Sequence, residues 1–106
     1  MDNTKQLLSM IGIAKKSGRI IVGVPMIIEH IQKKKALDPE EFLLIEACDT
    51  SENTHKRLTD KCEFYGIKRV QVSVTCEALG AAIGKSAVAA VAIIGKDMCR
   101  GVESRI

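Results

Sequence analysis

The chain has few aromatic side chains: its 106 residues include two Phe, one Tyr and no Trp. Because hydrophobic residues still make up 46% of the chain, the core must be aliphatic. OB-folds and RRMs bind single-stranded nucleic acid by stacking bases on aromatic rings. The scarcity of such rings disfavours that mode of recognition, so any binding of RNA would depend on backbone shape and on contacts to base edges.

Long apolar runs and a cationic start are also missing. No apolar run approaches the roughly 20 residues that a membrane-spanning helix needs, and Met-Asp-Asn-Thr is not the start of a secretory signal peptide. The net charge of +3 is well below that of proteins that coat phosphate without specificity. We therefore expect a cytoplasmic protein without a membrane partner, whose charge permits nucleic acid as a partner but does not establish one.

The four cysteines are widely spaced, with no C-x-x-C pair and no histidine at ligand spacing. This pattern predicts no metal site and no cofactor. In a reducing compartment we expect free thiols that act as small hydrophobic residues in or near the core. The residues concerned are Cys48, Cys62, Cys76 and Cys99.

The motifs that would indicate an enzyme are incomplete. Gly84-Lys85-Ser86 resembles a phosphate-binding loop, but three residues separate Gly80 from Gly84 where the motif has four. A strand should precede such a loop and a helix should follow it, which is the reverse of the order expected here. His30 and His55 have no nucleophile beside them in sequence, and we interpret both as solvated helix residues. We expect no catalytic activity.

Hydrophobic periodicity and capping residues predict alternating helices and strands in one domain, residues 1–106. This order favours a central sheet between helices. Asp2 or Asn3 can cap the first helix, Ser51 and Thr75 can cap later ones, and Gly66 can end the third. The expected helices cover residues 7–16, 25–35, 52–65, 76–83 and 98–106, and the expected strands cover 20–22, 42–47, 70–74 and 87–94.

One basic cluster lies next to a glycine turn. Lys15, Lys16 and Arg19 are close in sequence to Gly23, where the chain enters a helix. Such a turn exposes unpaired backbone amides that can bind phosphate or carbonyl oxygens. We interpret the denser run Lys33-Lys34-Lys35 as solvated charge at a helix C-terminus.

Three segments resemble the ribosomal protein L7Ae family of kink-turn RNA-binding proteins, and specifically its small bacterial YlxQ-like branch. They are LSMIGIAKKSGRIIVG at 8–23, DTSENTHKRLTDKCEFYG at 49–66 and LGAAIGKSAVAAVAII at 79–94. The SENT and LTDKC stretches and the LG-x-A-x-G pattern before VAII are the most specific. The resemblance runs from about Leu7 to Lys96 and implies an α/β fold, a three-layer α/β/α sandwich with a four-stranded mixed sheet.

The resemblance also implies a binding surface for a sharply bent, internally looped RNA helix. The surface would join the start of the second helix, the turn before the third helix and the turn before the last strand. The implied partners are structured RNA, with ribosomal RNA as a candidate, and ribosomal or translation-associated proteins. In this chain the expected RNA-binding residues are Lys15, Lys16, Arg19, Gly23, Val24, Pro25, Ser51, Ile83, Gly84, Lys85 and Ser86.

The chain departs from the family at the first of these places. Where the family has Gly-x-Asn-Glu-x-x-Lys, this chain has Gly23-Val24-Pro25-Met26-Ile27-Ile28-Glu29, so only the glycine is kept. Two readings stay open. The protein binds RNA with relaxed or altered specificity through Lys15, Lys16, Arg19 and Lys85, or it is a protein-interaction module whose contact patch is Val24, Pro25 and Met26.

Overall fold

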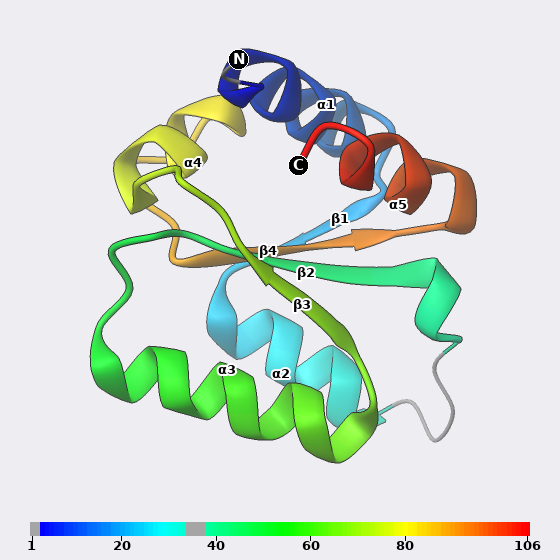
Figure 1. Cartoon of the computed structure of the whole chain (residues 1–106), viewed down its shortest axis with the longest axis vertical. Coiled ribbons are helices and arrows are strands. Elements are labelled where there is room, and N and C mark those ends of the chain that lie inside the picture. The colour runs from blue at the N-terminus through cyan, green and yellow to red at the C-terminus, as the bar shows by residue number, and fades with distance from the viewer. Residues whose placement is uncertain (1–2, 34–37) are drawn as a thin grey trace.

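The computed structural model describes residues 3–33 and 38–106, and shows helices and strands in the predicted alternating order (Figure 1). A short 3-10 helix, η1, which the sequence did not predict, precedes the second strand. The helices are α1 (Thr4–Lys16), α2 (Val24–Lys33), η1 (Pro39–Glu41), α3 (Glu52–Tyr65), α4 (Cys76–Ala82) and α5 (Lys96–Glu103), and the strands are β1 (Ile20–Val22), β2 (Phe42–Glu46), β3 (Lys68–Gln71) and β4 (Ala90–Ile94).

The strands form one mixed sheet in the order β1-β4-β2-β3. β4 lies antiparallel to both β1 and β2, whereas β2 and β3 are parallel. The carboxyl ends of β1, β2 and β3 therefore lie at the same edge of the sheet as the amino end of β4. Every connection that leaves β1 or β2 for a helix starts at this edge.

Helices cover both faces of the sheet, which confirms the three-layer sandwich: α1, α4 and α5 lie on one face, and α2 and α3 on the other (Figure 1). Alternate residues of the strands divide between the two cores, as the period of a β-strand requires. Leu43 and Ile45 pack under α1, α4 and α5, whereas Phe42 and Leu44 pack against α2 and α3. Among the described residues Phe42 is the one buried aromatic side chain, and most of the core is aliphatic, as the composition predicts.

The predicted caps of α3 and α4 are confirmed. The Ser51 hydroxyl accepts a hydrogen bond from the amide of Thr54, and the Thr75 hydroxyl accepts one from the amide of Ala78. Gly66 ends α3 with a φ of 68°, a left-handed conformation that glycine adopts without strain. Asn3 precedes α1 but makes no side-chain cap bond, and Asp2 lies outside the described residues.

Two strand boundaries were predicted wrongly because apolar alternation does not stop where strand pairing stops. β3 begins at Lys68 and ends at Gln71, but Val72 and Val74 beyond it are still buried in the core. β4 begins only at Ala90, because the amide of Val88 bonds to the Cys76 carbonyl and holds the preceding residues against α4. The last helix also begins earlier than expected, at Lys96.

The expectation for the cysteines holds for only part of the set. Cys62 and Cys99 are buried, Cys76 is half-buried, and Cys48 is exposed, so Cys48 is not a core residue.

No helix within the described residues is both long and apolar enough to cross a membrane.

Candidate functional site

The three turns that the resemblance singles out lie side by side at one edge of the sheet. The amide of Gly23, after β1, donates to the carbonyl of Ala90, with 3.1 Å between nitrogen and oxygen. The amide of Ala47, after β2, donates to the carbonyl of Ala89 at 2.8 Å. We call this region the turn end, defined as residues 23–26, 47–54 and 83–89. The Gly23 amide is already bonded within the fold, so it is not the free donor that the sequence suggested.

Asp49 ties the turn after β2 to the start of α4. Its Oδ1 accepts a hydrogen bond from the amide of Cys76 at 2.7 Å, and the amide of Cys48 donates to the carbonyl of Val74. Hydrogen bonds from the thiol and the amide of Cys76 hold the pKa of Asp49 below its ordinary value. The exposed Asp49 thus has a structural role at the turn end, because its hydrogen bond joins the turn after β2 to the start of α4.

Two of the predicted cations share a groove with part of the turn end. Lys15 and Lys16, at the end of α1, line an open hollow of about 820 Å³ together with Ile83 and Gly84. The rest of its lining is small, apolar or hydroxyl-bearing: Leu8, Ser9, Gly12, Ile13, Ala78, Ala81 and Ala82. Lys85 and Ser86 are exposed on the turn that follows.

Arg19 does not join this group. Its carbonyl accepts from the amide of Ile94, and its guanidinium lies against Gly95, whereas Gly23 meets Ala90. Ala90 and Ile94 are the two ends of β4, roughly 13 Å apart at about 3.3 Å per residue. The sequence placed Arg19 beside Gly23 because only four positions separate them, but β1 carries the chain from one edge of the sheet to the other.

The start of α2 presents apolar side chains at the turn end. Pro25 and Met26 are exposed, Met26 to 57%, while Val24 packs partly against the core beneath α2. Glu29, where the family pattern has lysine, is exposed and forms an ion pair with Lys33 one turn further on, at 2.7 Å. The hydrogen bond from the Lys33 ammonium, and then its positive charge, lower the pKa of the Glu29 carboxyl below its ordinary value.

Ser51 is at the turn end, but its hydroxyl is used within the fold. It accepts from the Thr54 amide and donates to the Thr54 hydroxyl at 2.9 Å. Ser51 therefore shapes the start of α3, and its contribution to a binding surface would be through that shape.

Sequence reasoning missed a buried polar cluster beside the same turn. Glu46, the last residue of β2, has no exposed surface; it forms an ion pair with Arg69 of β3 and a hydrogen bond with Nδ1 of His55 of α3. His55 and His30 are both in helices, as predicted, but are only partly solvated: Nδ1 of His55 bonds to the buried Glu46, and the His30 ring stacks on Phe42 with centroids 5.8 Å apart. A glutamate inside the otherwise apolar run 42–47 was the available signal, since an unpaired charge is not stable in a core.

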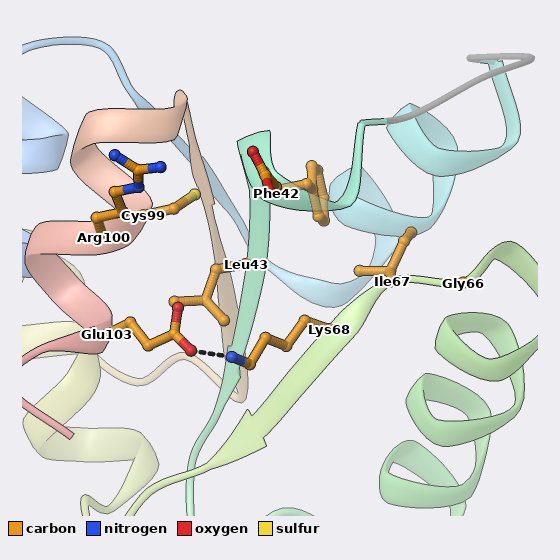
Figure 2. A pocket seen from close by; sticks show the side chains of 9 residues that line it. Phe42, Leu43, Gly66, Ile67, Lys68, Cys99, Arg100 and Glu103 are labelled. Carbon is orange, nitrogen blue, oxygen red and sulfur yellow. Dashed lines mark hydrogen bonds and ion pairs between the residues drawn. The ribbon is translucent and has the colours of Figure 1, made fainter.

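A separate hollow of about 490 Å³ lies at the opposite edge of the sheet, between α5 and the starts of β2 and β3 (Figure 2). Lys68 and Glu103 form an ion pair across it, with Arg100 and the Cys99 thiol nearby (Figure 2). Burial raises the pKa of Cys99 to about 11, and its thiol donates to the Ile93 carbonyl. Cys99 is therefore a neutral thiol near pH 7 and a poor nucleophile.

Within residues 3–33 and 38–106, no three His, Cys, Asp or Glu side chains are grouped closely enough to hold a metal ion.

Comparison with known proteins gives the family. The model of the Ribosomal protein L7Ae/L30e/S12e/Gadd45 family matches residues 5–101. The chain is 33% identical over 84 residues to a Bacillus subtilis (strain 168) protein named RNA-binding protein YlxQ, which covers 79% of this chain and 78% of that protein. It is 32% identical over 65 residues to a protein of the same name from Enterococcus faecium, covering 61% of this chain and 58% of that protein.

Solved structures show the same fold. A protein of unknown function from Bacillus halodurans C has a TM-score of 0.79 and 25% identity, over 93% of this chain and 94% of that one. A Giardia lamblia 15.5kD RNA binding protein has a TM-score of 0.65 and 23% identity, over 98% and 90%. The sandwich and its connections are thus shared by proteins whose sequences differ widely.

Proposed function

Because the chain belongs to the Ribosomal protein L7Ae/L30e/S12e/Gadd45 family, we propose that it binds structured RNA at the turn end and carries out no catalysis. The observation that carries the proposal is the convergence of the three turns, joined by hydrogen bonds from Gly23 to Ala90 and from Ala47 to Ala89. The name of the Bacillus subtilis relative, an RNA-binding protein, supports the same ligand class. Ribosomal RNA in the cytoplasm, together with translation-associated proteins, is the proposed setting.

The specificity differs from that of the family pattern. Pro25 has no side-chain donor or acceptor, and Met26 offers an exposed thioether where the pattern has a carboxylate. Each lost hydrogen bond to a base costs roughly 1–3 kcal/mol of discrimination. The protein therefore binds folded RNA mainly through the shape of the turn end and the cations Lys15, Lys16 and Lys85, with relaxed or altered sequence preference.

Crosslinking in cells, followed by sequencing of the attached RNA, tests the ligand class without assuming a bent motif. We expect enrichment of internally looped segments, with ribosomal RNA among them. An RNA yield no higher than that of an unrelated cytoplasmic protein of equal size would contradict the proposal.

The exposed Cys48 offers a second test that also locates the interface. Cys48 belongs to the turn end, so bound RNA should slow its alkylation. The control is a Cys48→Ser, Asp97→Cys variant, which places an exposed thiol at the start of α5, at the opposite edge of the sheet. Equal protection of both thiols would show that RNA binds elsewhere or without a defined site.

One observation favours a second function, a protein-interaction module. Met26 is a large apolar side chain that is 57% exposed next to exposed Pro25. A contact of this kind buries apolar surface and responds little to salt, whereas RNA binding weakens log-linearly with salt. Met26→Lys should abolish the protein contact and leave RNA affinity equal to or above that of the wild type.

A further inference from the structure

The carboxylate of Glu46 is buried completely, yet each of its oxygens has a partner. Oε1 accepts from Nη1 of Arg69 at 2.9 Å. Oε2 lies 2.7 Å from Nδ1 of His55 and accepts from the hydroxyl of Thr50 at the same distance. The partners come from β3, from the first turn of α3 and from the turn before it. One buried group thus holds three segments that border the turn end.

Arg69 alone balances the charge of Glu46. Its side chain is 22% exposed and its guanidinium carries a permanent positive charge. The bond to His55 is therefore not needed for neutrality. A buried ion pair is also weak evidence for stabilisation, because apolar residues of the same size often serve as well. We therefore look for the role of the Glu46–His55 hydrogen bond in its effect on the His55 ring.

Glu46 determines how the His55 ring is presented. A carboxylate bonded to Nδ1 keeps the proton on Nδ1 and orients the ring, as such pairs do in metal and catalytic sites. The His55 side chain is 42% exposed. The hydrogen bond of His55 to Glu46 is made by Nδ1. In the described part of the chain, every buried side-chain nitrogen or oxygen has a hydrogen-bond partner, so Nε2, which is not bonded to Glu46, belongs to the exposed part of the ring. His55 is in the first turn of α3, directly after residues 47–54 of the turn end.

We propose that Glu46 holds the His55 ring so that Nε2 forms a hydrogen bond with a ribose 2′-hydroxyl of RNA bound at the turn end. This inference rests on the proposed function. His55 is the residue that contacts RNA, and Glu46 is the positioning residue that acts through it. Arg69 and Thr50 complete the support by fixing Glu46 itself.

The 2′-hydroxyl is favoured over the phosphate by hydrogen-bond chemistry. With the Nδ1 proton given to Glu46, Nε2 of a neutral ring accepts, and Nε2 of a protonated ring donates. A 2′-hydroxyl is both donor and acceptor, so it pairs with Nε2 in either state. A phosphate oxygen only accepts and would pair with the protonated ring alone. The contact would therefore distinguish RNA from DNA at this position.

Two substitutions separate the two nitrogens of the ring. His55→Asn places an amide near the position of Nδ1 and keeps the bond to Glu46, but removes the outward nitrogen. His55→Gln places an amide near Nε2 and gives up the inward bond. We expect the Asn variant to keep the wild-type melting temperature and lose roughly five- to tenfold in RNA affinity. The Gln variant should melt lower and keep more of the affinity.

The ligand atom is identified by replacing riboses one at a time. The probe is an internally looped RNA hairpin, titrated by fluorescence anisotropy, in which each nucleotide in turn carries a 2′-deoxyribose. One position should weaken wild-type binding by the same five- to tenfold and have no further effect on His55→Asn, as expected for two halves of one hydrogen bond. Glu46→Gln should reduce the effect of that position in part.

The outcomes are distinct. Lys56→Ala removes a full charge from the neighbouring exposed residue of α3 and should not alter the response to any 2′-deoxy position. If the wild type binds the hairpin and every 2′-deoxy effect is the same in wild type and His55→Asn, the inference is overturned while the proposed function stands. If the Asn variant keeps full affinity, the inference is also overturned. If the wild type binds neither the hairpin nor RNA recovered by crosslinking, the proposed function itself fails.

Discussion

At the scale of single residues, exposure and ionisation separate the four cysteines. Burial raises the pKa of Cys62, Cys76 and Cys99 to about 11 in each case, and for Cys76 the hydrogen bond to Asp49 adds to the effect. Cys48 is exposed on the turn after β2. Since the thiolate is the reactive form, the first three thiols are unreactive near neutral pH.

We therefore predict that iodoacetamide at pH 8 alkylates Cys48 first, with the other three at least tenfold slower, because each pKa unit above the working pH lowers the thiolate fraction about tenfold. Peptide mass spectrometry over time measures the order. In a Cys48→Ser variant the fast phase should disappear. Fast labelling of Cys62 would show instead that the core beneath α3 opens readily.

Asp49 predicts a dependence of stability on acid. Its folded-state pKa lies below the ordinary value of 3.8, so the protein gains stability from the ionised form above about pH 4 and loses it as pH falls through the lowered pKa. The melting temperature of Asp49→Asn should be below that of the wild type at pH 6, and the gap should close as the pH falls below about 4. Asp60→Asn, on the exposed surface of α3, is the control and should show no such convergence.

At the scale of elements, the caps decide where helices begin. The Ser51 hydroxyl bonds to the Thr54 amide at the start of α3. Ser51→Ala should destabilise the protein by about 1 kcal/mol in urea unfolding, whereas Ser51→Asp, which also caps well, should stay near the wild type. Equal loss in both variants would mean that the hydroxyl serves something other than capping.

A close approach of backbones shapes the turn between α4 and β4. A Cβ at Gly80 would lie 2.9 Å from both the nitrogen and the Cα of Ala87, so Ala87 would have to move. Gly80→Ala should cost roughly 1–3 kcal/mol of stability and weaken RNA binding, because the displaced turn carries Lys85. Gly101→Ala is the matched control: its Cβ meets only the end of the flexible Met10 side chain, which can turn aside.

At the scale of the whole molecule, the charge is mixed and the net charge is small. The turn end has exposed Lys85 together with exposed Asp49 and Glu52, while Lys15 and Lys16 line the groove beside it. RNA affinity should fall log-linearly with salt, with a slope of about 0.7–0.9 for each phosphate contacted. The number of contacts, read from the slope, should be small.

Charge reversal tests which cations make those contacts. Lys15→Glu, Lys16→Glu, Lys85→Glu should weaken RNA binding more than tenfold and lower the salt slope. The control triple Lys61→Glu, Lys68→Glu, Arg100→Glu has the same net charge. It changes α3, β3 and α5 outside the turn end, and should have a smaller effect. Equal effects of the two triples would show that only net charge matters; unchanged affinity in the first would exclude the proposed cations.

Much of the fold could be read from the chain, because local rules govern it. Alternation along strands, helical periodicity, and the caps Ser51, Thr75 and Gly66 depend on neighbours within a few residues. Strand ends were less accurate: Val72 and Val74 alternate as a strand does and are buried, but they lie beyond the end of β3, where single backbone hydrogen bonds join them to Glu46 and Cys48. The functional roles of the predicted site residues remain predictions.

The sequence by itself determined the order of elements, the aliphatic core and the resemblance to a family, since these follow from composition, period and motif. Only the tertiary structure decided which distant residues meet. It moved Arg19 to the far edge of the sheet from Gly23 and brought His55, Arg69 and Thr50 to the carboxylate of Glu46. The physical reason is that a strand separates neighbours in sequence, while sheet pairing and helix packing join residues that no local pattern relates.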